Sequence, residues 1–170
     1  MKKLKLLLIL FFAINSWILS AQTTETYEEN PSETSIMLGC ISISDFQKPP
    51  FVFWYQPAYD SYPLDTCKLL KISSDTISGI SVEVIFGSWC SDSRSEIPIF
   101  LKVCDYLNIS ENITLIGVDK SKTIPSNCDE NKIRSVKFVP TYFFYYNGKL
   151  LKKIVDHSDI TIEHLFSLLY

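Results

Sequence analysis

The chain is poor in histidine, and it has no Cys-x-x-Cys motif. Among its 170 residues there are only two histidines, His157 and His164, both near the C-terminus. Zinc sites in proteins draw on clustered cysteine and histidine ligands, commonly with two cysteines at close spacing. The sequence therefore predicts neither a bound metal nor another resident cofactor.

The sequence also lacks a run of basic residues, an internal repeat and a low-complexity tract. It has 16 Lys and Arg against 19 Asp and Glu, and residues 1–21 hold three of the lysines and no acid. Without that segment, 13 basic and 19 acidic residues remain, which is a net charge of −6. Proteins that bind nucleic acid need clustered positive charge to meet the phosphates. We expect no nucleic-acid partner.

Residues 1–21 have the pattern of a secretory signal peptide. A basic start at residues 2–5 precedes an apolar run at 6–13, and small residues follow at 20–22. The apolar core is short for a membrane-spanning helix, although residues 17–19 extend it and leave an uncleaved anchor as the alternative. The pattern predicts a secreted or periplasmic protein without stable membrane association after cleavage.

The chain contains five cysteines, an odd number. In an exported protein disulfides can persist, and an odd count leaves at least one thiol unpaired within the molecule. The sequence does not assign the pairing. A bond between Cys40 and Cys67 is one expectation, because both lie in the same N-terminal segment.

The chain divides into segments of different character. Residues 22–35 are polar and read as a flexible lead-in. Residues 36–78 are rich in proline and aromatic rings, and we expect this N-terminal extension to pack its rings on the domain that follows. A carbohydrate or peptide platform is the alternative for these rings. The regular domain occupies residues 79–170.

Hydrophobic periodicity in residues 79–170 predicts the order β-α-β-α-β-β-α. Asn147-Gly148 is the strongest signal, because this dipeptide favours a two-residue hairpin turn. The expected elements are a strand at 81–86, a helix at about 91–107 with Pro98 inside it, a strand at 113–118, a short helix at 129–136, strands at 141–146 and 149–155, and a final helix capped by Ser158.

The main chemical feature is Cys90, which stands where the 81–86 strand gives way to the next helix. Unpaired backbone N–H groups and the helix dipole at such a position stabilise a thiolate, which is the nucleophilic form. The four residues after Cys90 are polar, which predicts access to solvent. Asp92 opposes the thiolate by its charge, whereas Ser93 can donate a hydrogen bond to it.

Four features in order resemble the thioredoxin superfamily over residues 79–170: Trp89-Cys90, Pro98, Val139-Pro140-Thr141 and the Asn147-Gly148 hairpin. The resemblance implies a thioredoxin-like three-layer α/β/α sandwich with a mixed central sheet. It also implies a cis peptide bond before Pro140, which would face Cys90. Val139 would pair with an extended substrate through its backbone, and Trp89 would shape the cleft.

The chain departs from the family pattern in two places. Ser93 stands where a dithiol oxidoreductase has its second cysteine, and Val84 stands where the family often has a buried acid. Serine cannot form a disulfide, so the usual internal release of a mixed disulfide is missing. Cys104 lies 14 residues along the same helix, or about 21 Å from Cys90, which is too far for a bond.

These features predict an exported thiol–disulfide exchange protein that works as a monothiol. Cys90 would form mixed disulfides with cysteine-containing proteins or peptides, and an external thiol reductant would release them. One alternative is a thioredoxin-fold module that binds peptides without catalysis. Another is a dithiol oxidoreductase in which Cys128 resolves the mixed disulfide, because its loop follows the 113–118 strand.

Overall fold

The computed structural model describes residues 26–27, 35–72, 77–129, 133, 135–155 and 161–169. The predicted signal peptide, nearly all of the predicted lead-in, His157 and Ser158 lie outside them. None of the helices in the described ranges is long and apolar enough to cross a membrane.

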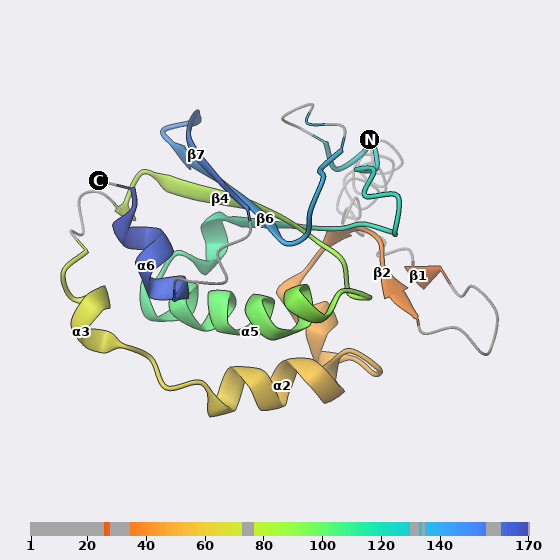
Figure 1. Cartoon of the computed structure of the whole chain (residues 1–170), viewed down its shortest axis with the longest axis horizontal. Coiled ribbons are helices and arrows are strands. Elements are labelled where there is room, and N and C mark those ends of the chain that lie inside the picture. Colours follow the sequence, from red (N-terminus) through yellow and green to blue (C-terminus); the bar gives the residue numbers. More distant parts are fainter. Residues whose placement is uncertain are drawn as a thin grey trace, which may run out of the picture.

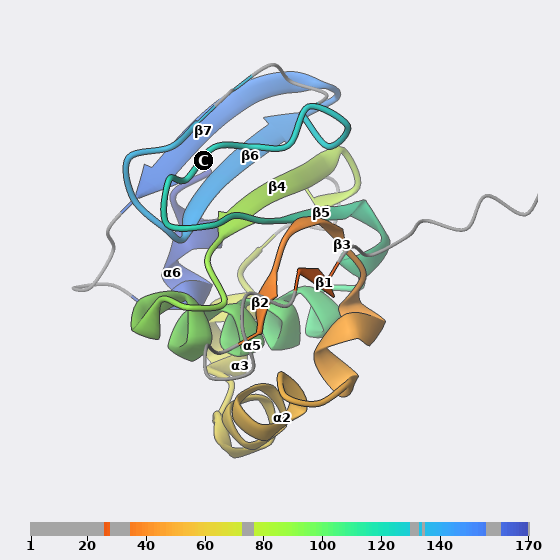
Figure 2. The ribbon, with the colours of Figure 1, turned by 90° about the vertical axis from the view of Figure 1, so that its right-hand side faces the viewer.

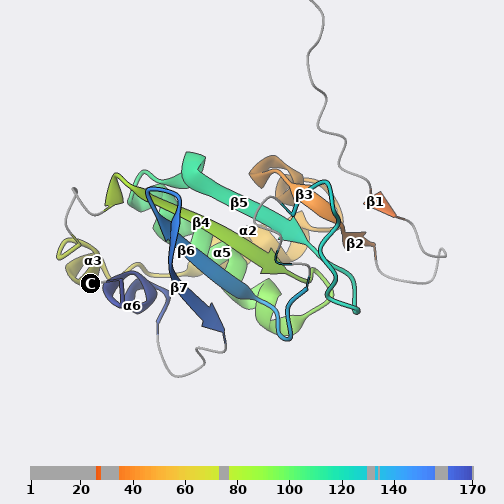
Figure 3. The same cartoon turned by 90° about the horizontal axis from the view of Figure 1, so that it is seen from above.

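A five-stranded mixed sheet with the order β3-β5-β4-β6-β7 forms the centre of the fold (Figure 3). The central strands β4 and β5 run parallel, which requires the crossover that α5 supplies between them, and the other neighbours are antiparallel. A separate pair consists of β1 (Thr26–Tyr27) and β2 (Ile36–Met37). The main strands are β3 (Gly39–Ile41), β4 (Ile80–Phe86), β5 (Ile113–Gly117), β6 (Thr141–Tyr146) and β7 (Lys149–Val155).

The described α-helices lie on one side of the sheet (Figures 1 and 2). Helices α5 and α6 pack directly on it, with Ile97 and Phe166 buried against strand residues such as Phe144. Helix α2 covers the outer side of α5, and α3 lies beside α6. The bounds are η1 (Ile43–Gln47), α2 (Val52–Ser61), α3 (Thr66–Leu69), α5 (Ser91–Tyr106), η2 (Ser110–Asn112) and α6 (Ile162–Ser167).

The other face of the sheet is covered by the connection between β5 and β6. Ile124, Cys128, Val136 and Val139 of this connection pack on strand residues such as Ile85 to form a second apolar cluster. The helix predicted at 129–136 is not present among the described residues of that range. The backbone N–H of Ile133, which a helix would pair with the Asp129 carbonyl, donates instead to the Asp129 carboxylate at 2.5 Å.

The predicted mixed central sheet and thioredoxin-like α/β class are confirmed by this architecture. The helical layer predicted on the second face is not seen among the described residues, because the β5–β6 connection covers that face without forming a helix there. The strands and the Pro98-containing helix lie within a residue or two of their expected bounds, and Asn147 and Gly148 form the hairpin turn with φ of 47° and 76°. The final helix starts later than predicted, because its N-cap residue is Thr161 rather than Ser158. Strand β3, which completes the sheet from within residues 36–78, was not predicted.

The aromatic rings of residues 36–78 lie against the domain. Phe46 is fully buried and its ring centroid is 5.6 Å from that of Phe86 at the end of β4. Tyr55 stacks on Phe46 at 4.9 Å, and Trp54 meets it edge-on at 5.7 Å. Phe53, in contrast, is 73% exposed. Most of this ring cluster therefore contributes to the core beside the end of β4.

A Gly117→Ala substitution should disturb the contact between β5 and the backbone of Met37 in the N-terminal extension. A Cβ at Gly117 would lie 2.4 Å from the backbone oxygen of Met37, and a backbone atom cannot swing away as a side chain can. We expect the free energy of unfolding to fall by about 1–3 kcal/mol, as for other overpacked sites. Urea unfolding measures it. The exposed Thr114→Ala on the same strand is the control, with an expected loss below about 1 kcal/mol, and an equal loss in both variants would contradict the steric explanation.

Candidate active site

Cys90 is the N-cap residue of α5, with φ −89° and ψ 130°. A short loop from Gly87 leads from β4 to this position, and the Cys90 N–H donates to the Gly87 carbonyl at 2.9 Å. The Cys90 carbonyl accepts the N–H of Arg94 at 3.0 Å, which begins the helix. The side chain is partly exposed. The thiol therefore stands at the positive end of a helix dipole with access to solvent.

Cys90 faces the segment that enters β6. Its thiol donates to the carbonyl oxygen of Val139 at 3.5 Å, and the peptide bond between Val139 and Pro140 is cis. Val139 and Pro140 are both largely buried. The fold thus brings together three of the residues that the sequence proposes for the site, although they are 49 positions apart.

Trp89 is fixed beside the cysteine from two sides. Its indole N–H donates to the carbonyl of Val118, just past β5, at 2.9 Å. The ring lies over Gly87, where a Cβ would be 2.6 Å from the ring atom Cε2. Gly87 is therefore needed for the ring position, and Trp89 closes one side of the surface around Cys90.

Ser93 is fully buried in the first turn of α5. Its Oγ accepts the backbone N–H of Gly87 at 3.3 Å. The side chain therefore ties the start of the helix to the end of β4. At the position of a second thiol, this chain has a shielded hydroxyl.

Ser88 anchors the loop before Cys90 through contacts that sequence reasoning did not find. The Ser88 Oγ accepts the N–H of Met37 at 2.8 Å, and the Ser88 carbonyl accepts the Nε–H of Arg94 at 2.5 Å. The Arg94 guanidinium also lies 6.0 Å from the ring centroid of Trp54. Met37 and Trp54 come from residues 36–78, so that segment supports the loop before Cys90 directly through Ser88 and indirectly through Arg94. No local pattern marks the contacts of Met37 and Trp54, because their partners Ser88 and Arg94 lie far away in the sequence.

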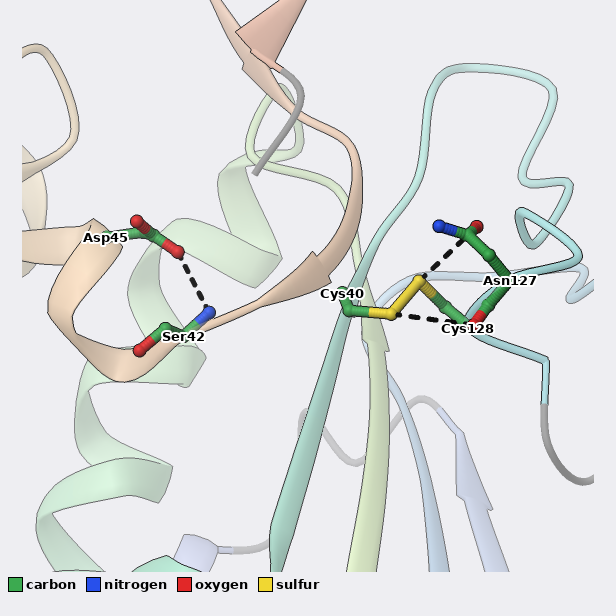
Figure 4. The surroundings of a disulfide bond; sticks show 5 residues. All are labelled: Cys40, Ser42, Asp45, Asn127 and Cys128. Carbon is green, nitrogen blue, oxygen red and sulfur yellow. Dashed lines mark hydrogen bonds between the residues drawn. A yellow bond between two sulfur atoms is a disulfide. The ribbon is translucent and has the colours of Figure 1, made fainter. Parts of the chain in front are cut away.

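A disulfide joins Cys40 on β3 to Cys128 on the β5–β6 connection, with Cα atoms 5.5 Å apart (Figure 4). The expected Cys40–Cys67 pairing is wrong, because Cys67 is a free, exposed thiol on α3. The prediction assumed that cysteines close in sequence would pair. Cys40 and Cys128 are 88 residues apart in sequence, but their strand and loop are neighbours in space. Cys128 is thus bonded to Cys40, and a resolving role at Cys90 would first require this bond to open.

The remaining cysteine, Cys104, is fully buried in α5. Burial in the apolar core raises the pKa of its thiol well above the usual value, with a smaller contribution from the charge of Asp105. Both effects disfavour the thiolate. Cys104 is a core residue, as its place in the helical stripe predicts.

A buried carboxylate does occur on β4, one residue before Val84. Glu83 is 4% exposed and points to the second face of the sheet, where it lines a cavity of about 220 Å³ with Cys40, Cys128 and Tyr145. Burial and the charge of Glu83 raise the pKa of Tyr145 to about 12.

Within the described residues, no three His, Cys, Asp or Glu side chains gather as metal ligands.

No family model and no curated protein matches the chain. Among solved structures, the chain is similar to oxidised thioredoxin O2 from Arabidopsis thaliana, with 23% sequence identity and a TM-score of 0.36. The alignment covers 61% of this chain and 82% of the thioredoxin O2 chain. A thioredoxin variant from Halobacterium salinarum is 15% identical to this chain, with a TM-score of 0.33. That alignment covers 59% of this chain and 79% of the Halobacterium chain. Any likeness at such identities concerns the fold alone.

Proposed function

We propose that this protein is an exported thiol–disulfide exchange protein that acts through a single thiol, that of Cys90. The observation that carries the proposal is the position of this thiol. It stands at the start of α5, partly exposed, 3.5 Å from the carbonyl of Val139. Backbone groups next to a thiol can bind an extended chain and present a substrate sulfur to it.

In the first step the Cys90 thiolate attacks one sulfur of a substrate disulfide. The substrate S–S bond breaks, a new S–S bond forms between Cys90 and that sulfur, and the second substrate sulfur leaves as a thiolate that takes a proton from water. The attacking sulfur stands at the N-terminus of α5, partly exposed. Ser93 accepts the Gly87 N–H through its oxygen, so its own hydroxyl proton is left as a hydrogen-bond donor one helical turn from Cys90.

In the second step another thiolate attacks the mixed disulfide and displaces Cys90. If that thiolate belongs to the substrate, the substrate disulfides are rearranged without net oxidation or reduction. If it belongs to an external thiol, a second external thiol completes the exchange: the substrate is reduced and the external thiols are oxidised to their disulfide.

The other cysteines support a monothiol mechanism. Cys104 is buried, and Cys40 and Cys128 are bonded to each other. Cys67 is free, but it lies on α3, at the end of the molecule opposite the start of α5 (Figures 1 and 3). A thiol that can reach the mixed disulfide must therefore come from outside this chain, unless the Cys40–Cys128 bond opens first.

Export is part of the proposal, and the signal-peptide pattern of residues 1–21 supports it. A disulfide such as Cys40–Cys128 suits an oxidising space such as a bacterial periplasm. Sequencing the N-terminus of the protein recovered after expression with its natural leader tests this part. Cleavage after Ala21 is the expected result, and an intact leader would contradict it.

Trapping of mixed disulfides tests the exchange function. We expect the purified protein, incubated with a disulfide-containing protein and quenched by alkylation, to give covalent adducts at Cys90. A Cys90→Ala variant should lose them by at least about a hundredfold, because no other free thiol stands at the site. Mass spectrometry of the tryptic peptides identifies the linked cysteine.

Cys67→Ala is the matched control, because it removes the other exposed free thiol and should leave the adducts unchanged. If the wild-type protein binds the substrate but forms no adduct, the non-catalytic binding module is the better description. If the adducts survive in Cys90→Ala, the assignment of the nucleophile is wrong.

A further inference from the structure

A cavity of about 440 Å³ opens beside the segment that faces Cys90. Residues immediately before and after the Val139–Pro140 pair line it, and the end of β7 closes it. Because the Val139 carbonyl is 3.5 Å from the Cys90 sulfur, this cavity begins within one or two residues of the point of exchange. We name it the lysine cavity, and its lining residues are Ser135, Val136, Lys137, Phe138, Thr141, Lys153 and Val155.

The lysine cavity has a rigid wall with an exposed aromatic side chain. Thr141 is buried, and its hydroxyl donates to the carbonyl of Phe138 at 2.7 Å, which fixes the bend of the chain before β6. The Phe138 ring is 60% exposed although its neighbours Val136 and Val139 are buried. A large apolar side chain held in solvent next to a reactive thiol is suited to contact with a bound chain.

The charge of the lysine cavity is opposite to that of the whole protein. Two of its lining residues are lysines and none is a carboxylate, whereas the chain as a whole has a net charge of −3. Both lysines are exposed, and neither forms an ion pair with a described residue. The ammonium group of Lys153 lies 5.2 Å from the ring centroid of Phe143, so it stands over the sheet face that the cavity borders.

We propose that the lysine cavity selects substrate segments that carry an acidic side chain close to the exchanging cysteine; this rests on the proposed function. An extended chain advances about 3.3 Å per residue, so a side chain one to three positions from the cysteine reaches the cavity. The net negative charge of the protein disfavours such a segment, and the two lysines of the cavity supply the opposite charge beside Cys90. Asp92, in the first turn of α5, disfavours an acidic side chain on the helix side of Cys90.

The test uses three synthetic peptides that differ only two positions from their cysteine, where they carry Glu, Gln or Lys. Each is supplied as its mixed disulfide with a nitrothiobenzoate. Attack of Cys90 on the peptide sulfur forms the Cys90–peptide bond and releases the coloured aromatic thiolate, which gives the rate. The peptides are made with the variable residue on either side of the cysteine, and rates are normalised to those of free glutathione with the same peptides.

We expect the Glu peptide to react about three to ten times faster than the Gln peptide in one of the two orientations, and the Lys peptide to react more slowly. Raising the ionic strength from about 0.05 M to about 0.5 M should reduce the preference, because exposed charges are screened. The Lys137→Gln/Lys153→Gln variant should lose it. Lys71→Gln/Lys149→Gln is the control with the same change of net charge at two exposed lysines outside the cavity, and it should keep the preference.

Equal rates for the three peptides, or a preference that survives in Lys137→Gln/Lys153→Gln, would overturn the inference while leaving the exchange function intact. A wild-type protein that fails to react even with the symmetric nitrothiobenzoate disulfide would contradict the proposed function instead. In that case the affinity of Cys90→Ser for fluorescent peptides with Ala in place of cysteine still decides the inference. Tighter binding of the Glu peptide, lost in the lysine double variant, supports it, and equal binding refutes it.

Discussion

A Ser93→Cys variant should form an internal disulfide with Cys90, which the natural chain cannot do. Cys90 is the N-cap of α5 and Ser93 is the third residue of the helix. Side chains three positions apart at a helix start have Cβ atoms about 5–6 Å apart, and a small shift of the half-helical N-cap brings them within disulfide range. Serine and cysteine are similar in shape, so the buried site should accept the new thiol.

The new thiol should also shorten the life of mixed disulfides at Cys90. It is held next to the linked sulfur, so its attack is intramolecular and should be faster than that of an external thiol by at least about a hundredfold. Because the Ser93 side chain is fully buried, the thiol at position 93 should attack from within and should not itself capture substrates. Gly87 loses an oxygen acceptor for its N–H, at a cost of about 1 kcal/mol in unfolding free energy.

Counting alkylated thiols after mild oxidation measures the effect. The wild-type protein should keep a reactive thiol at Cys90, and Ser93→Cys should lose both thiols as a pair, with a mass change of two hydrogens. Ser95→Cys is the control, because it places an exposed thiol five positions from Cys90 on the same helix. If both thiols of Ser93→Cys stay open to alkylation, the two positions do not face each other, and the comparison with a dithiol motif fails.

Local signals explain which parts of the fold were predictable. In strand β4, every second residue (Val82, Val84 and Phe86) faces α5. The Asn147-Gly148 turn fixes the β6–β7 hairpin. Both patterns can be recognised from a few consecutive residues. Strand β3 has only three residues and is defined by its pairing with β5, so no local pattern in the sequence predicts it. The 129–136 segment has a helix-like sequence, but the Asp129 side chain takes the N–H that the helix would use.

The same distinction applies to the candidate site. Cys90, Trp89 and the Val139–Pro140 pair are recognisable because they fall in a known order along the chain. The contact of Ser88 with Met37 could not be predicted, because it depends on where residues 36–78 fold back onto the domain. The disulfide partner of Cys128 was missed for the same reason.

Removal of the Cys40–Cys128 disulfide should have the largest effect on stability of any single substitution proposed for this chain. The bond closes a loop across 88 positions, and chain-entropy reasoning for such a loop gives about 4–5 kcal/mol. Native structure remaining in the reduced chain lowers this value, so we expect Cys40→Ser to reduce the free energy of unfolding by about 3–5 kcal/mol. Cys40 is exposed, so the new hydroxyl is solvated and the variant reports on the bond alone.

Cys128→Ser should be at least as unstable, because Cys128 is 3% exposed and its hydroxyl replacement lies in the second apolar cluster. The double variant should add little to Cys128→Ser, since one bond cannot be lost twice. Urea unfolding with and without reductant measures these values, and Cys67→Ser is the control that should change nothing. A wild-type protein whose stability is unaffected by full reduction of this bond would contradict the argument.

The site should respond to the same change, because the disulfide holds the connection that faces Cys90. Cys128, Val136 and Val139 belong to one apolar cluster, against which Trp89 and Cys90 are packed. When the bond is lost, the connection keeps this packing and its hydrogen bonds to Trp89 and Cys90 but loses its covalent tie to β3, so Val139 should be held less firmly beside the thiol. We therefore expect Cys40→Ser to slow exchange with peptide disulfides more than exchange with a small aromatic disulfide, which needs no docking to Val139. Equal slowing of both reactions would mean that the disulfide stabilises the fold without positioning the site.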